Sequence, residues 1–491
     1  MGVTGLKAAV GRVAGWSAGH PWPALALWLV VVAVSTAGGA LALRTPAGEL
    51  FAADSTGRRL LWYALAGCAA VLLLLVALLA AITPAVVALL VSLSAVAVAT
   101  SWWSVVARLL PEQCPSTSVL ALVAVLGTAL GITYCLLYLW VERQARRHGA
   151  RRPHVARTAA ASSRAVLLSS LVTIAVVSGL FVSGDAMLSA VAVGVILTVA
   201  AVMLASVTAL PAVTARFGRR LGWPRLPVLW RLTYRLGPPR LWPLLLRPGT
   251  RRPGWTLAAS VALLAVLALP LAWWRPELPG QPATLLHAAE AARAHGVPAA
   301  TIVAVIASTV LLGFAALTAA FRSAPAAVAV TVPGALAAAA ACGTATLILR
   351  TWKPHQAPGS WGHSTPAAWA PLLSFALALA VSVLLLRHVV LRIAELRSTG
   401  MSPREATARA VTSTSDGVSV TAVIMCTIFL LAERTGSVEV GRLSIVLACA
   451  VVLTATVVRA LTLPALAVLL TGTRFWARNA GRHPGHSLPQ K

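Results

Sequence analysis

The stretch SVLLLRHVVLRIAELRSTG at residues 382–400 is an apolar run that becomes basic and ends in glycine. The stretch GITYCLLYLWVERQARRHG at residues 131–149 follows the same order. A second match joins VTALPAV around Pro211 to LTLPALA around Pro464. Many membrane transporters consist of two such repeats, with a binding region at the repeat interface. The sequence therefore predicts two similar halves within one membrane protein.

Apolar runs recur along the whole chain. Its 491 residues are 59% hydrophobic and only 11% charged, whereas soluble proteins carry about 25% charged residues. A run of about 20 apolar residues is long enough to cross a bilayer as a helix. We therefore expect an all-α membrane bundle of about twelve transmembrane helices in two six-helix repeats. The runs lie near 22–43, 59–82, 84–109, 117–141, 164–183, 187–213, 254–274, 297–321, 325–350, 367–391, 414–433 and 440–470.

The same pattern predicts four parts of the chain. They are a first repeat at residues 1–215, a basic linker at 216–253, a second repeat at 254–472 and a tail at 473–491. The linker mixes arginine with tryptophan, a composition suited to the lipid headgroup layer. Its several prolines exclude one long helix, so we expect an interfacial segment on the cytoplasmic side.

Positive charge is concentrated in a few segments. The net charge is +28, from 40 Lys and Arg against 12 Asp and Glu. In a soluble protein this excess would suggest nucleic acid. Here the arginines cluster at 143–164, 216–252 and 387–409, and the connections between these clusters carry few. Because cytoplasmic loops are enriched in Lys and Arg, we predict a multi-pass protein of the inner (plasma) membrane with both termini cytoplasmic. Its expected partners are membrane lipids and not nucleic acid.

Residues that would support an enzyme or a metal site are not arranged for either role. Of the six cysteines, only Cys114 lies outside an apolar run, so the spacing predicts neither a disulfide framework nor a zinc site. His355 and His363 have no nearby acid or cysteine. The sequence shows no phosphate-binding loop, nucleophile elbow or paired carboxylates. We expect no enzymatic activity, cofactor or metal.

The segment Ser402-Pro403-Arg404-Glu405 predicts a short helix before the eleventh apolar run. Ser402 can cap it, Pro403 fits its first turn and Glu405 can complete a capping box. Glu405 and Arg409 lie one turn apart and can pair. We expect the matching segment, Pro153–Ser163, to form a similar elbow in the first half.

Several of these motifs resemble the MMPL family of the RND superfamily of exporters. The resemblance implies a twelve-helix membrane core of RND type and a lipid or another hydrophobic small molecule as cargo. Relatives often form trimers, so it also implies a homo-oligomer. The residues that carry it are Arg392, Glu395, Gly400, the elbow segment, Thr456–Leu466, Gly131–Tyr134, the Leu-Pro-Ala at 210–212, Gly218–Pro224 and Phe321-Arg322-Ser323.

The chain departs from the family in the connections that follow the first run of each half. Family members carry a large extracytoplasmic porter domain at each of these places. Here the connections are only Arg44–Arg58 and Arg275–Gly296, which are too short for a domain with its own core. We therefore expect a reduced form without the porter domains.

The second departure concerns proton coupling. The family's relay resembles Asp-Tyr pairs in the fourth and tenth spans. This chain has Thr133-Tyr134 and Leu384-Leu385 there, and Thr454 where the twelfth span often carries Asp. None of its twelve acids lies near the middle of an apolar run. Because a carboxylate relay needs a titrating group inside the membrane, we expect no recognisable relay.

A few polar residues inside the apolar runs remain as candidates for a substrate path. Thr133, Tyr134 and Cys135 form the main cluster, but their polar groups can instead bond to backbone or to a neighbouring helix. Arg459 lies within the last run, where a charge is costly and suggests a role. Its partner would be a carbonyl, a hydroxyl or a lipid phosphate, or the side chain snorkels to the membrane surface. The candidate residues are Thr133, Tyr134, Cys135, Ser382, Thr454 and Arg459.

Other charged residues near the run ends have simpler interpretations. Asp416 follows three hydroxyl residues at the start of the eleventh run, where an acid caps a helix and complements its dipole. Arg387 and His388 lie closer to a run end and are expected at the membrane interface.

Two functions are compatible with this reading. In the first, the chain carries lipid or another hydrophobic cargo between its halves without a carboxylate relay. In the second, it is a degenerate family member that serves as a scaffold or regulator of an envelope protein. A polar or lipid-open groove near Tyr134 and Ser382 would favour transport, whereas a sealed apolar core would favour a scaffold.

Overall fold

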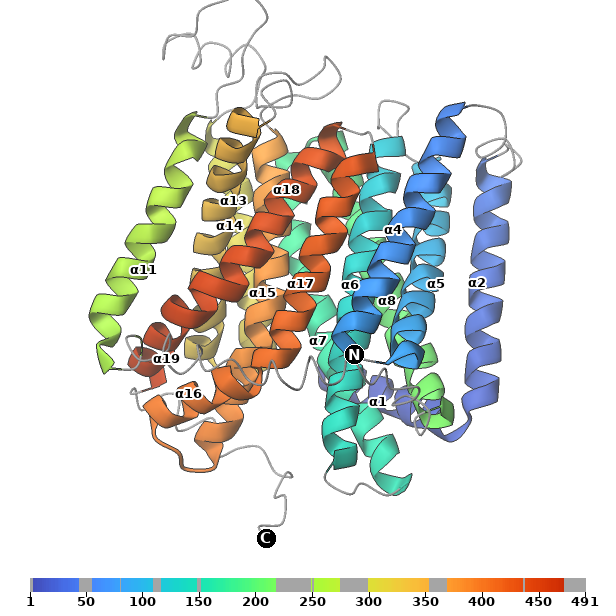
Figure 1. Cartoon of the computed structure of the whole chain (residues 1–491), viewed down its shortest axis with the longest axis horizontal. Helices are drawn as coiled ribbons and strands as arrows, with labels where there is room; N and C mark the ends of the chain where they lie inside the picture. The colour runs from blue at the N-terminus through green and yellow to red at the C-terminus, as the bar shows by residue number, and fades with distance from the viewer. Residues whose placement is uncertain are drawn as a thin grey trace, which may run out of the picture. The chain divides into compact units, whose positions relative to one another are not determined.

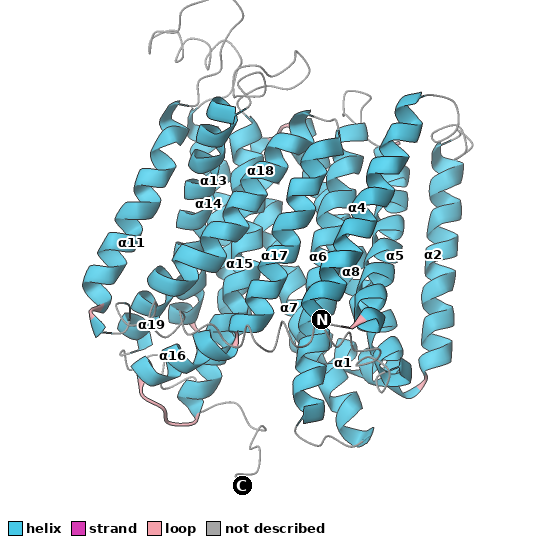
Figure 2. Cartoon of the chain, viewed as in Figure 1, coloured by secondary structure: helices cyan, strands magenta, loops and turns pink. Residues whose placement is uncertain are grey.

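The structure is a computed structural model of the whole chain. It describes residues 3–43, 55–79, 81–108, 116–147, 152–217, 249, 251–273, 299–352, 369–435 and 438–471. Helices fill nearly all of these ranges, and no β-strand forms within them (Figure 2). The all-α class predicted from the apolar runs is confirmed. Most of the linker and the tail after residue 471 lie outside the described residues, as does Cys114.

Twelve helical segments of the described chain coincide with the twelve predicted runs. Eleven of these segments contain a helix that is long and apolar enough to cross a membrane. The remaining segment, α4, contains the shorter apolar helix Leu65–Leu79. The segments are α2 (Pro21–Leu43), α4 (Ser55–Leu79), α5 (Ile82–Ala107), α6 (Ser116–Arg147), α7 (Arg152–Ser178) continuing into η1 (Gly179–Ser183), α8 (Ala186–Phe217), α11 (Pro253–Ala268) continuing into η2 (Leu269–Trp273), α13 (Ala299–Phe321), α14 (Ala324–Trp352), α15 (Trp369–Ser398), α17 (Ser415–Ala432) followed by η4 (Glu433–Thr435), and α18 (Val438–Leu453) continuing into η5 (Thr454–Thr462) and α19 (Leu463–Thr471).

The chain folds into two compact units. Unit 1 comprises Met1–Gly237 with Val420–Ala448, and unit 2 comprises Pro238–Ser419 with Cys449–Lys491. Each unit therefore takes part of the last two spans, because the chain passes from unit 2 to unit 1 within α17 and returns within α18. The boundaries of the two repeats, at residues 215 and 254, stay a prediction. They were drawn from sequence similarity, whereas the two units are defined by internal contacts.

Unit 1 is built around α5, α6 and α8. Helix α5 packs against α6, α8 and α2, and α4 also contacts α5. An additional helix, α1 (Val3–Gly19), packs against α7 and α8 and runs crosswise to the spanning helices of this unit (Figure 1). The sequence reading did not predict α1, because it is short and contains Lys7 and Arg12.

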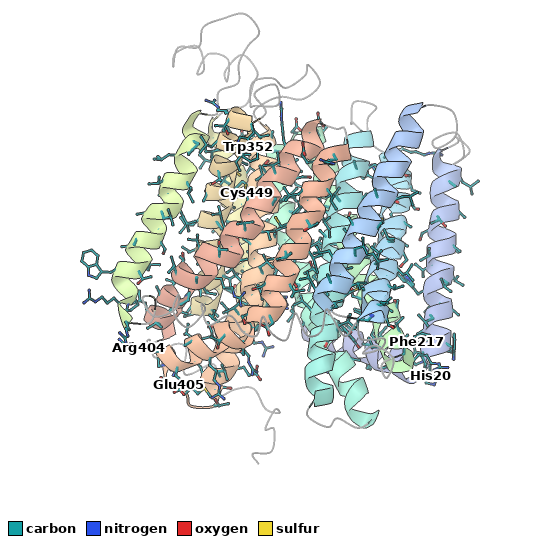
Figure 3. All side chains as sticks on the ribbon, viewed as in Figure 1. His20, Phe217, Trp352, Arg404, Glu405 and Cys449 are labelled. Atoms are coloured by element: carbon teal, nitrogen blue, oxygen red, sulfur yellow. The ribbon has the colours of Figure 1, made fainter. Side chains whose placement is uncertain are left out.

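Unit 2 is built around α14 and α15. Helix α14 packs against α15, α11 and α13. The short helix α16 (Pro403–Ser413) packs against α15 and α19 at one end of the unit. Figure 3 shows Arg404 and Glu405 on this helix, with Trp352 at the opposite end of the unit.

The predicted elbow before the eleventh span is confirmed as α16. Its N-cap is Ser402, whose hydroxyl accepts a hydrogen bond from the Glu405 backbone N–H at 3.3 Å. Gly400 precedes it with φ of +87°, a conformation that glycine adopts without steric cost. The pairing of Glu405 with Arg409 stays a prediction.

The prediction of a separate elbow helix in the first half is wrong. Helix α7 runs without interruption from Arg152 to Ser178, through the whole of Pro153–Ser163. The two segments differ in composition. The first half has three alanines at 159–161, which favour helix. The second has Thr412 to Ser415, where the Ser415 hydroxyl donates to the Thr412 carbonyl at 2.7 Å and competes with helical bonding.

Close helix contacts depend on small residues, such as those of GALAAAAACG (residues 334–343) in α14. An ideal Cβ on Gly343 in α14 would lie 2.2 Å from the Leu267 carbonyl oxygen and 2.8 Å from the Ala268 Cα. Both atoms belong to the backbone of α11, which cannot rotate away as a side chain can. In the same way, a Cβ on Gly131 in α6 would lie 2.4 Å from the Ser92 hydroxyl of α5.

We predict that Gly343→Ala lowers thermal stability in detergent by roughly 1–3 kcal/mol, because α11 must move away from α14. The control is Gly67→Ala in α4, where an added Cβ meets no atom within 4 Å. Both substitutions gain the same helix propensity, about 1 kcal/mol, so only the contact differs. Equal melting curves for the two variants would contradict the close approach of α11 and α14.

Candidate functional site

The polar residues predicted in the second half come together around an irregular part of the last span. Residues Thr454–Thr462 form a π-helix, η5, between α18 and α19. Such helices are rare and frequently mark functional sites. The Thr454 hydroxyl at the start of η5 hydrogen-bonds to the Ser382 hydroxyl of α15 at 2.8 Å, and both side chains are fully buried. This pair links α15 to η5 inside unit 2.

Arg459 lies one π-turn after Thr454, and only 1% of it is exposed. Its Nη2 donates to the Val411 carbonyl at 3.1 Å, and its Nη1 donates to the Ser419 hydroxyl at 3.3 Å. Asp416, in the first turn of α17, adds an electrostatic attraction. Of the alternatives that the sequence left open, the structure selects bonding to a carbonyl and a hydroxyl, and excludes a snorkelling side chain. It also shows that an acid, Asp416, lies within electrostatic reach.

These contacts give Arg459 a clear structural task. Val411 belongs to the last turn of α16, where helix carbonyls lack partners within the helix. A cation near these carbonyls also complements the helix dipole. Arg459 therefore stabilises the C-terminal end of the elbow helix and joins it to the π-helix and to α17.

The sequence reading missed a second buried arginine. Arg387 of α15 was expected at the membrane interface, yet only 1% of it is exposed. The side chain of the neighbouring His388 folds back on α15, where its ring Nδ1 lies 2.9 Å from the Leu384 carbonyl oxygen. Its position near a span end indicated the lipid headgroup layer, but the structure buries the side chain in protein.

The first-half cluster lies in unit 1 and is enclosed by protein. Thr133, Tyr134 and Cys135 are buried. The Thr133 hydroxyl donates to the Ala129 carbonyl of its own helix at 2.7 Å, and the Ser170 hydroxyl of α7 donates to the Tyr134 hydroxyl at 3.5 Å. The Thr133 hydrogen bond matches the alternative in which a polar side chain of the apolar run bonds to backbone.

The six candidate residues thus form two groups. Ser382, Thr454 and Arg459 lie on connected elements of unit 2, and Thr133, Tyr134 and Cys135 are consecutive residues of α6 in unit 1. The described residues include no group of three or more His, Cys, Asp or Glu that could hold a metal ion.

Comparison with known proteins finds a family match over part of this chain. Residues 34–256 match the model of the MMPL family. The chain is 34% identical over 156 residues to the Mycolic acid-containing lipids exporter MmpL11 of Mycolicibacterium smegmatis and to the Heme uptake protein MmpL11 of Mycobacterium tuberculosis. Each match covers 32% of this chain but only 16% of the relative.

Two solved structures share the fold over most of this chain. SecDF, a translocon-associated membrane protein from Thermus thermophilus, covers 85% of this chain with a TM-score of 0.59 and 14% sequence identity, and the match covers 62% of SecDF. The hedgehog release protein Disp from the water bear Hypsibius dujardini also covers 85%, with a TM-score of 0.53 and 12% identity, over 71% of its own chain.

The described helices share the fold of these two membrane proteins, and residues 34–256 match the MMPL family. The resemblance to that family predicted from the sequence is confirmed over this part of the chain.

We predict that Arg459→Met weakens the attachment of α16, because the Val411 carbonyl and the Ser419 hydroxyl lose a charged donor. Each such bond contributes about 1.5–3 kcal/mol. Hydrogen exchange of the backbone amides of residues 404–413 in α16 should therefore become faster. The control is Arg404→Met, an exposed arginine of the same helix. Unchanged exchange in Arg459→Met would refute the stabilising role of Arg459.

Proposed function

We propose that the chain moves a lipid or another hydrophobic small molecule within or across the cell membrane. The observation that carries this proposal is the RND-type helical core, combined with the MMPL match over residues 34–256. Two of the relatives are named a mycolic acid-containing lipids exporter and a heme uptake protein, and both names refer to cargo with large apolar surfaces. A bundle that is largely apolar is a suitable path for such cargo.

The mechanism we propose uses hydroxyl groups where the family's relay has carboxylates. The pair Ser382–Thr454 joins α15 to the π-helix at 2.8 Å. Hydroxyl groups do not ionise near neutral pH, so this pair cannot take up and release a proton as a carboxylate does. It can exchange its hydrogen bond for one to the polar head of a cargo molecule when α15 and η5 separate.

The arginine distribution supports an orientation with the basic segments on the cytoplasmic side. Under this proposal both termini are cytoplasmic, and the Ser402–Ser413 elbow faces the cytoplasm. The protein acts as a carrier and not as an enzyme.

The second candidate function is a membrane scaffold for an envelope protein. The homo-oligomer expected from the family resemblance is compatible with this function. The scaffold function rests on the way the buried polar groups bond within the chain. Arg459 donates to Val411 and Ser419, and Thr133 donates to its own helix. A path for cargo would require some of these bonds to exchange, whereas a scaffold would keep them.

A liposome assay tests transport and distinguishes these candidates. The purified chain is reconstituted with a fluorescent phospholipid, and movement between leaflets is followed with a membrane-impermeant quencher. Transport predicts faster movement than in protein-free liposomes. Replacing the hydroxyl pair by Ser382→Ala with Thr454→Val should slow it by about threefold, the equivalent of one interhelical hydrogen bond.

The matched control is Thr331→Val in α14. Thr331 is also buried, but its hydroxyl donates to the Ala327 carbonyl of its own helix at 2.9 Å. Transport predicts little change in this variant. Lipid movement no faster than in protein-free liposomes, together with a second protein that co-purifies from the native membrane, would favour the scaffold.

A further inference from the structure

Helix α1 places a mixed basic and aromatic face at one end of unit 1. Figure 1 shows α1 running across the ends of the spanning helices. It packs against α7 and α8 through a stripe of small residues in which Gly11, Ala14 and Ser17 are buried. Its opposite face exposes Arg12, Val13, Trp16 and His20. A helix with arginine and tryptophan on its exposed side is typical of one that lies in the headgroup layer.

Residues from α2 and α8 extend this face. Arg216, in the last turn of α8, holds its guanidinium 5.6 Å from the ring centre of Trp22 and 5.7 Å from that of Phe217. Trp22 is 62% exposed and Trp16 is 45% exposed. The Trp16 and His20 rings stack at 5.7 Å. Figure 3 labels His20 and Phe217 at this end of the unit.

A third arginine lies against α1 itself. The Nε of Arg164 in α7 is 3.0 Å from the position that a Cβ on Gly11 would occupy. The absence of a side chain at Gly11 therefore lets the exposed Arg164 reach the surface of α1. Arg12, Arg164 and Arg216 thus come from three helices of this unit, and the side chain of Arg216 contacts the aromatic rings.

The charge of this surface is uncompensated by the helices that build it. Helices α1, α2, α7 and α8 contain no Asp or Glu at all. Arginine binds phosphodiester oxygens in a bidentate way, and exposed tryptophan favours the boundary between headgroups and acyl chains. Nucleic acid would satisfy the charge but would leave the exposed Val13, Trp16 and Trp22 in water.

We propose that Arg12, Trp16, Trp22, Arg164 and Arg216 form a binding surface for the headgroups of anionic phospholipids. The α1 helix lies in the headgroup layer, with the indole rings at the acyl boundary and the guanidinium groups on the phosphates. This surface holds resident membrane lipid and is distinct from the hydroxyl and arginine group of unit 2. It does not depend on transport.

The test is native mass spectrometry of the full-length chain released from nanodiscs that contain equal amounts of phosphatidylglycerol and phosphatidylcholine. The wild type should retain phosphatidylglycerol preferentially. The double variant Arg12→Gln with Arg216→Gln should lower the ratio of retained phosphatidylglycerol to phosphatidylcholine by about fivefold for each arginine removed.

The control is Arg404→Gln on α16. It removes one exposed positive charge from a surface where Glu405 follows directly in the sequence, and it should leave the ratio unchanged. If the double variant does not fold, the single variants Trp22→Leu and Arg216→Lys replace it. Each keeps the net charge but removes the indole or the bidentate donor, and each should lower the ratio.

Equal retention of the two lipids by the wild type would overturn the proposal. A loss of phosphatidylglycerol in Arg404→Gln as large as in the double variant would overturn it too, because general positive charge would then account for the preference. A wild-type preference that survives in every variant would place the lipid elsewhere on the chain.

Discussion

Hydrocarbon offers no hydrogen-bond partner to a peptide or a hydroxyl group, and the structure follows from this constraint. Apolar runs become helices because a helix satisfies its own backbone. Buried hydroxyls repeat this solution locally: Thr133 and Thr331 both donate to the carbonyl four residues earlier. A side chain that cannot bond within its own helix must reach another element. Arg459 does so by donating to the carbonyl of Val411 at the end of α16.

Polar groups that reach other helices therefore show where the bundle is specialised. In unit 2 they gather at the π-helix η5, where Ser382 meets Thr454 and Arg459 holds the elbow. In a π-helix the backbone bonds span five residues, so the register changes at each end. A segment of this kind can convert to α-helix with a shift of its side chains.

The sequence predicted most of the fold because apolar length and capping chemistry are local properties. Ser402, Pro403 and Glu405 identified the elbow α16. Prediction from the sequence failed where contacts between helices determine the structure. The burial of Arg387 and the π-helix after Leu453 depend on neighbouring helices, and α1 is too short and too polar to be recognised by apolar length. Thr454 and Ser382 were named separately, and only the structure shows that they touch.

We propose that this helical core moves lipid with hydroxyl groups and without a carboxylate relay. The most direct test is proton movement through the reconstituted chain, followed with a pH-sensitive dye inside liposomes under an imposed gradient while lipid transport is recorded. The account predicts lipid movement at a rate that does not change when the proton gradient is collapsed, and no proton flux above that of protein-free liposomes. Lipid movement that stops with the gradient, accompanied by proton entry, would contradict it.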